Sequence, residues 1–164
     1  MPRQPDIRLL LSHPTHFISL GFGSGLSPKA PGTAGSLAAI PVYYLLSLLL
    51  TPLEIALLCI PLFLLGCWVC DYTGRILGVS DHGAIVFDEM VAMWLVMAAA
   101  PQNWQGALAA FIAFRLFDIW KPWPIRWLDK HVKGGFGVML DDLLAAGFAI
   151  GVILGSLQFL PFRL

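Results

Sequence analysis

Five apolar runs separated by short polar segments constrain the fold of this chain more than any other feature. The runs cover residues 36–50, 55–70, 90–100, 106–120 and 143–160. Only 12% of the residues are charged, which is about half the share found in a typical soluble domain. Long apolar stretches with few charges are typical of helices in or beside a lipid bilayer. We therefore expect residues 1–164 to form a single all-α membrane domain.

The lengths of the runs bear on how many helices are embedded. Only the run 143–160 approaches the roughly 20 residues that comfortably span a bilayer. The other runs must use flanking residues, tilt, or lie buried within the bundle. The run 90–100 becomes plausible only if residues 85–87 extend it, which would draw Asp88 and Glu89 into the helix. The prediction is a polytopic helical bundle with about four to five membrane-embedded helices.

Positive charges are distributed unequally among the polar segments. Segments 51–54 and 101–105 contain no Lys or Arg, whereas the other polar segments contain Arg3, Arg8, Lys29, Arg75, Lys121, Arg126, Lys130 and Lys133. Because cytoplasmic loops are enriched in Lys and Arg, we predict that the N-terminus and the charged segments face the cytoplasm. Arg163, near the opposite terminus, is the exception. The net charge is zero, so the composition does not indicate nucleic-acid binding.

Carboxylates at the ends of the apolar runs fall almost entirely on this predicted cytoplasmic side. They are Asp71, Asp88, Glu89, Asp118, Asp141 and Asp142. Ionisable groups at membrane depth are costly and usually mark a functional site. Clustered carboxylates suit Mg²⁺, which prefers oxygen ligands and often binds together with a phosphate. The pattern predicts an acidic site at the cytoplasmic rim that binds Mg²⁺ and an anionic substrate.

The segment KAPGTAGS, residues 29–36, is a candidate phosphate-binding loop. Gly32 and Gly35 allow close approach of the backbone, and the helix that follows directs free N–H groups toward an anion. The predicted phosphate contacts are Lys29, Thr33, Ser36 and Lys121. The alternative is structural, because Thr33 or Ser36 could simply cap a helix that starts after Pro31.

The acidic residues also have structural interpretations. Asp118 and Lys121 could form a surface ion pair between residues three apart on a helix. Asp141 and Asp142 could be a pair at a helix N-terminus, where the helix dipole favours negative charge. Adjacent helical residues point about 100° apart, so at most one of these two aspartates points directly at a shared centre.

The tryptophans of WKPWPIRW, residues 120–127, fit an aromatic belt at the membrane interface better than a cofactor site. Trp120, Trp123 and Trp127 therefore predict that this segment lies in the lipid headgroup layer. A substrate that is itself a lipid headgroup would meet the protein there.

Four motifs, KAPGTAGS, IVFDEMVAMW, FRLFDIWKPWPI and GGFGVMLDDLLAAG, occur in this order between Phe22 and Phe148. In this combination the chain closely resembles the phosphatidylglycerophosphatase A family, with a mild departure at Ala92, where we expect Gly. The resemblance implies a Mg²⁺-dependent, multi-pass phosphatase of the bacterial inner membrane that converts phosphatidylglycerophosphate to phosphatidylglycerol and phosphate. The catalytic and metal-binding residues that it implies are Glu89, Asp118, Asp141 and Asp142, with Asp71 and Asp88 as second choices for the metal.

Two alternatives remain open from the sequence. In the mechanism, either a water molecule or a carboxylate, Asp118 or Asp142, could attack phosphorus. In function, a small membrane carrier could also keep an acidic ion or proton site at the cytoplasmic rim. Carriers usually place such a site near the bilayer midplane and often contain internal repeats, and the two halves of this chain share no repeat. The sequence does not set the oligomeric state.

Overall fold

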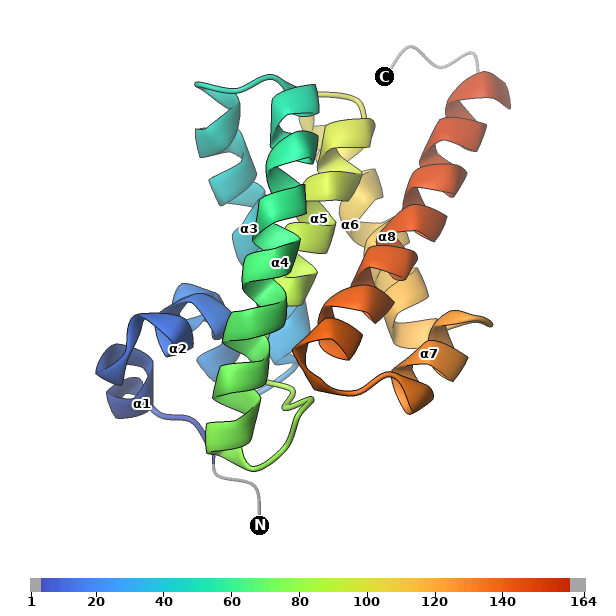
Figure 1. Ribbon diagram of the computed structural model, residues 1–164. Helices are drawn as coiled ribbons and strands as arrows, with labels where there is room; N and C mark the ends of the chain where they lie inside the picture. Colours follow the sequence, from blue (N-terminus) through green and yellow to red (C-terminus); the bar gives the residue numbers. More distant parts are fainter. Residues whose placement is uncertain (1–3, 160–164) are drawn as a thin grey trace.

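A computed structural model describes residues 4–159, which form five long helices with short helical segments around one end (Figure 1). The long helices are α3 (Pro31–Ser47), α4 (Pro52–Leu77), α5 (Phe87–Ala99), α6 (Trp104–Trp120) and α8 (Gly134–Phe159). The short segments are α1 (Ile7–Ser12), α2 (Pro14–Ser19), the 3₁₀ helix η1 (Gly21–Leu26) and α7 (Ile125–His131). No strand occurs in this part of the chain, which confirms the all-α class. Arg3 and Arg163 lie outside the described residues.

Local sequence signals set the ends of α4. At its start, the Thr51 hydroxyl accepts from the Glu54 amide while the Glu54 carboxylate accepts from the Thr51 amide, which forms a capping box. At its end, Gly78 adopts the left-handed conformation that terminates many helices. The helix extends seven residues beyond the apolar run that ends at Cys70, so Asp71 lies inside it.

Helix α5, the shortest of the five long helices, is central, because it packs against α3, α4, α6 and α8. Met90, Met93 and Val96 along it are fully buried. The helix begins at Phe87, two residues after the start expected from the extension over residues 85–87, and its first turn carries Asp88 and Glu89 as predicted. The most buried helix of the bundle therefore brings two acidic residues into the interior.

The helices alternate in direction, so the connecting segments collect at two ends of the bundle (Figure 1). The loops 48–51 and 100–103, which lack Lys and Arg, lie at the upper end of the view. The segments α1, α2 and α7 and the loop 78–86 lie at the lower end. The charged polar segments thus share one end of the molecule, as the sequence predicted.

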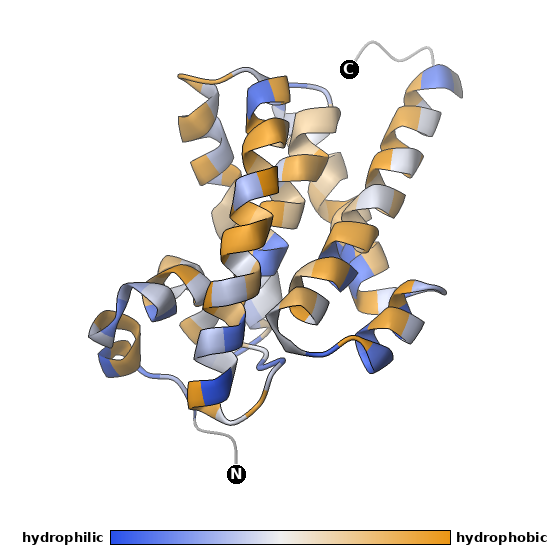
Figure 2. Ribbon diagram, in the orientation of Figure 1, coloured by the Kyte–Doolittle hydropathy of each residue, from blue (hydrophilic) through white to orange (hydrophobic). Residues whose placement is uncertain are grey.

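Apolar side chains cover much of the surface of the upper bundle. Figure 2 shows hydrophobic residues dominating the upper parts of the helices and hydrophilic residues gathering lower down. Leu49, Leu64 and Ile112 expose 88%, 66% and 58% of their surface, whereas soluble monomers rarely expose large contiguous apolar patches. Among the described residues, two helices are long and apolar enough to cross a membrane, Pro52–Leu77 and Gly134–Gln158. The protein is membrane-associated.

Candidate active site

Five carboxylates from three helices gather at one level of the bundle interior. Asp88 and Glu89 come from the first turn of α5, Asp118 from the last turn of α6, and Asp141 and Asp142 from α8. We call these five residues the acidic layer. Asp88, Asp141 and Asp142 are 8%, 6% and 3% exposed, and the charges of the other four all act on Asp142. The sequence prediction that these carboxylates converge is therefore confirmed.

Arg115 is a residue of the site that sequence analysis missed. Its guanidinium lies 3.3 Å from Glu89 Oε1 on α5 and also contacts Asp118 Oδ2 on its own helix. The side chain is only 14% exposed, as is that of Glu89. The structural alternative of a surface pair between Asp118 and Lys121 is wrong, because Arg115 is the partner of Asp118. An arginine inside an apolar run, one turn before an aspartate, was the available signal.

Lys121 ends α6 in the left-handed conformation and links two other elements. Its ammonium donates to Asp141 Oδ2 on α8 and lies 3.4 Å from Asp129 Oδ1 on α7. Burial lowers the pKa of Lys121, but the hydrogen bond and the charge of Asp141 outweigh it and hold the pKa above its ordinary value. Lys121 is therefore a permanent cation at the edge of the acidic layer.

The start of α3 lies directly against Glu89. A Cβ atom added at Gly32 would lie 2.0 Å from Glu89 Oε1, and one added at Gly35 would lie 3.2 Å from Glu89 Oε2. These contacts explain why glycines stand at both positions. They also place the predicted phosphate-binding segment beside the acidic layer, although it is far from α5 in sequence.

The sequence left open that Thr33 or Ser36 caps the helix that starts after Pro31, and the structure excludes this. Ala30, in the left-handed conformation, is the N-cap residue of α3, and neither Thr33 nor Ser36 caps the helix. The first amides of a helix have no partner within it, so this end can still accept an anion. Ser36 is fully buried and its hydroxyl donates to the Gly32 carbonyl, while Thr33 is half-buried and Lys29 is exposed.

Asp141 and Asp142 do not lie at the N-terminus of α8. The helix starts at Gly134, so these residues lie two turns inside it, and their interpretation as an N-terminal dipole pair is wrong. Gly135 makes this start possible, because a Cβ there would lie 1.8 Å from the Cys67 carbonyl oxygen of α4. The close approach of α8 to α4 brings the two aspartates into the interior.

Asp71, a second choice for the metal in the sequence analysis, lies outside the acidic layer. Its carboxylate pairs with Arg75 one turn later on α4 at 2.7 Å, and 32% of its side chain is exposed. It lies beside Gly134 at the start of α8. An exposed pair of this kind contributes little to stability. Asp71 thus already has a local partner in Arg75.

Unpaired oxygens in the acidic layer indicate which residues could hold a metal ion. Asp88 Oδ1, Glu89 Oε2 and Asp142 Oδ2 are buried without a hydrogen-bond partner, as is Arg115 Nε. Buried polar atoms are almost always paired in native proteins, so each such oxygen calls for a ligand. Asp118 and Asp141, by contrast, are occupied by Arg115 and Lys121.

The donor set therefore fits a hard divalent cation, although the side chains do not form a finished cage. Across residues 4–159, no group of three or more His, Cys, Asp or Glu is arranged to hold a metal ion as it stands. Mg²⁺ does not require such a cage, since it usually keeps several waters and binds one or two carboxylates together with substrate phosphate.

Comparisons with known proteins agree on one family. The family model for phosphatidylglycerophosphatase A matches residues 17–157. The chain is 47% identical to phosphatidylglycerophosphatase A of Escherichia coli (strain K12) over 158 residues, which cover 93% of this chain and 91% of that protein. The protein of that name from Haemophilus influenzae is also 47% identical, over 91% of this chain and 92% of its own length.

A third relative, from Bacteroides thetaiotaomicron, is 41% identical over 83% of this chain and 89% of its own length. It is provisionally named as a phosphatidylinositol-3-phosphatase. No solved structure matches the chain significantly.

Proposed function

This chain belongs to the phosphatidylglycerophosphatase A family, and we propose that the acidic layer is its active site. The protein is a phosphatase that acts on phosphatidylglycerophosphate. A water oxygen bonds to phosphorus, the bond from phosphorus to the terminal glycerol oxygen breaks, and that oxygen leaves with a proton as part of phosphatidylglycerol. Such a reaction needs a base for the water and positive charge for the phosphoryl oxygens.

The unpaired oxygens of Asp88, Glu89 and Asp142 are the observation that carries this proposal. Asp88 and Glu89 would hold Mg²⁺, which leaves Asp142 free to act as a base, and the ion when bound would supply positive charge that offsets carboxylate repulsion and polarises the phosphoryl oxygens. The carboxylates of Asp118 and Asp141 beside them are already paired, with Arg115 and Lys121 respectively.

The residues of the chain divide the remaining work. Asp142 is the general base, because one of its oxygens has no partner and it lies inside the acidic layer rather than at its edge. Arg115 holds Glu89 and Asp118 in position across two helices. The uncapped start of α3 and the cation of Lys121 orient the phosphate.

The same proposal extends to the membrane. Helices α3, α4, α5, α6 and α8 lie in the bacterial inner membrane, with the acidic layer at its cytoplasmic rim. Exposed apolar residues on α3, α4 and α6 support this placement, for example Leu45, Leu57 and Leu116. The Lys- and Arg-rich segments at the end nearest the acidic layer support the orientation.

The test is phosphate release by the detergent-purified protein from phosphatidylglycerophosphate, with Mg²⁺ and after its removal by a chelator. Phosphatidic acid, which has only the phosphomonoester, is measured beside it. We expect release that depends on Mg²⁺ and is lost in Asp142→Asn. Glu54→Gln is the matched control, because it removes a carboxylate in the first turn of α4, at the other end of the bundle from the acidic layer (Figure 1).

Three results would each contradict part of the proposal. Release that continues undiminished without any divalent cation would remove the metal from the mechanism. Full activity in Asp142→Asn would place the base elsewhere. A phosphoenzyme trapped during turnover and absent from Asp142→Asn would replace the water by the carboxylate of Asp142 as the attacking group.

A further inference from the structure

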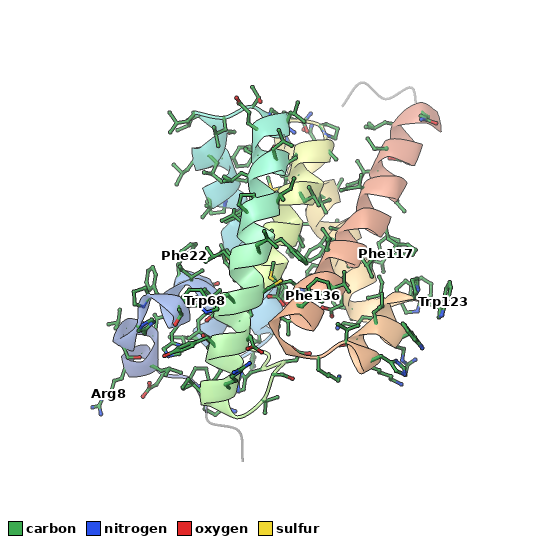
Figure 3. The ribbon with its side chains drawn as sticks, viewed as in Figure 1. Arg8, Phe22, Trp68, Phe117, Trp123 and Phe136 are labelled. Atoms are coloured by element: carbon green, nitrogen blue, oxygen red, sulfur yellow. The ribbon has the colours of Figure 1, made fainter. Side chains whose placement is uncertain are left out.

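A second candidate binding site lies outside the acidic layer, in a cleft of about 660 Å³ between the end of α6 and the helix α7. Its walls combine exposed indole rings with cationic side chains, namely Trp120, Trp123, Trp127, Lys121, Arg126 and Lys130. Figure 3 shows Trp123 projecting outward at this edge of the molecule. The mechanism proposed above uses only Lys121 of this set.

Two of these cations have no acidic partner. Arg126 and Lys130 are exposed and one helical turn apart on α7, and no ion pair is formed by either within residues 4–159. Like charges at this spacing repel each other. Asp129 lies between them in sequence, but its carboxylate pairs with Lys121. The cleft therefore has a net positive charge that an anion would balance.

The indole rings indicate where that anion comes from. Trp120, Trp123 and Trp127 are 68%, 81% and 52% exposed. Exposed tryptophans beside lysine and arginine are typical of the headgroup layer of a membrane. At that depth the available anions are lipid phosphates, and Arg binds a phosphate through two parallel hydrogen bonds.

Lys121 joins this cleft to the acidic layer. Its side chain lines the cleft, and its ammonium contacts Asp141 of the acidic layer. The two sites are thus separated by little more than one lysine side chain. A ligand that spans them would carry two anionic groups joined by a short linker.

We propose that the cleft binds the phosphodiester of the substrate lipid through Arg126 and Lys130, while the terminal phosphomonoester enters the acidic layer. This inference rests on the proposed function, because phosphatidylglycerophosphate carries these two phosphates on one glycerol unit. Phosphatidic acid has no second phosphate, so the cleft would distinguish the two lipids. Arg126 and Lys130 are substrate-binding residues and take no part in the chemical step.

The first test compares the wild type with the double variant Arg126→Gln/Lys130→Gln, using phosphatidylglycerophosphate in micelles of an uncharged detergent. We expect KM to rise about 10- to 100-fold, since two charge-assisted hydrogen bonds are lost, and kcat to change less than about twofold. Arg126→Lys/Lys130→Arg keeps the charges and should restore most of the affinity. Both residues are exposed on α7, so the substitutions leave the core intact.

Arg8→Gln is the matched control, because Arg8 is a surface cation on α1 at the other side of the molecule from Trp123 (Figure 3). It should leave KM unchanged. An equal rise of KM in Arg8→Gln would show a general effect of protein charge and overturn the proposal, as would an unchanged KM in the double variant. A wild type with no activity would instead reject the proposed function itself.

The second test separates the substrate's phosphodiester from that of a neighbouring lipid. The product phosphatidylglycerol keeps the phosphodiester and should inhibit the wild type competitively, with a Ki that rises about 10-fold or more in the double variant. If the cleft only docked the protein on anionic lipid, added phosphatidylglycerol would stimulate the wild type. Stimulation would overturn the proposal.

Discussion

The two ends of the bundle treat carboxylates in opposite ways. At the upper end, Glu54 accepts hydrogen bonds from the Thr51 amide and hydroxyl in a capping box. At the lower end, Glu89 and Asp142 are buried, and each has an oxygen without a partner. The upper carboxylate is exposed and satisfied by its own helix, whereas the lower ones lie among other acids of α5, α6 and α8.

Under the proposed function, Glu54 at the upper end serves folding, and the acids at the lower end serve binding. A capping residue stabilises its helix through local contacts, so its function is complete in the folded chain. A buried acid without a partner destabilises the fold and becomes favourable only when a ligand supplies the missing charge. The predictions below test this contrast.

The largest effect is expected for Asp142→Asn, which removes the proposed base and keeps the size of the side chain. Activity should fall about 10²- to 10⁴-fold, as for loss of a general base. The melting temperature in detergent should stay the same or rise, because a buried charge without a partner is removed. Phosphate release and thermal unfolding measure the two effects. A large drop in melting temperature together with the loss of activity would make Asp142 a folding residue and remove the contrast.

Arg115→Gln should affect both activity and stability. It leaves Glu89 and Asp118 buried without their shared cation, which costs about 3–5 kcal/mol when one partner of a buried pair is removed. Activity should fall about 100-fold or more, because the geometry of both acids relaxes. Equilibrium unfolding in mixed detergents and phosphate release check the two values. Arg75→Gln is the control, since its pair with Asp71 is exposed, and equal losses in both variants would contradict the assignment of Arg115.

Gly32→Ala tests whether the start of α3 positions Glu89 for catalysis. The new methyl group would collide with the Glu89 carboxylate, and because Glu89 must shift, activity should fall about 10-fold or more. Gly147→Ala is the matched control, because a Cβ at Gly147 meets nothing within 4 Å. Steady-state kinetics of Gly32→Ala and Gly147→Ala measure this difference. Identical kinetics of the two variants would show that Gly32 has no role in the site.

The smallest effect is expected at the upper end of the bundle. Thr51→Ala removes the cap of α4 and should lower stability by about 1 kcal/mol, as for other helix N-caps. Its activity should match that of the wild type, since the cap lies at the opposite end of the bundle from the acidic layer (Figure 1). Unfolding and phosphate release on this one variant show whether the two ends are independent. A loss of activity larger than the change in folded population would show that they are coupled.

The sequence by itself determined the helices and the level of the site. Apolar runs predicted all five long helices, and the need to lengthen the run 90–100 correctly placed Asp88 and Glu89 in the first turn of α5. The charge pattern predicted that the Lys- and Arg-rich segments share one end of the bundle. These features are local, because run length, helix breakers and the sign of a charge can be read along the chain. The four motifs also indicated the family, which the comparisons confirm.

Only the tertiary structure decided which charges meet. Arg115 of α6 reaches Glu89 on α5, and Lys121 at the end of α6 reaches Asp141 on α8, because these pairs depend on how α6 faces α5 and α8. The contact of Gly32 with Glu89 joins positions 57 residues apart in the sequence, and no periodicity encodes it. Sequence spacing set the depth of each acid along its helix, whereas helix packing decided which acids meet a cation from another helix and which oxygens stay unpaired.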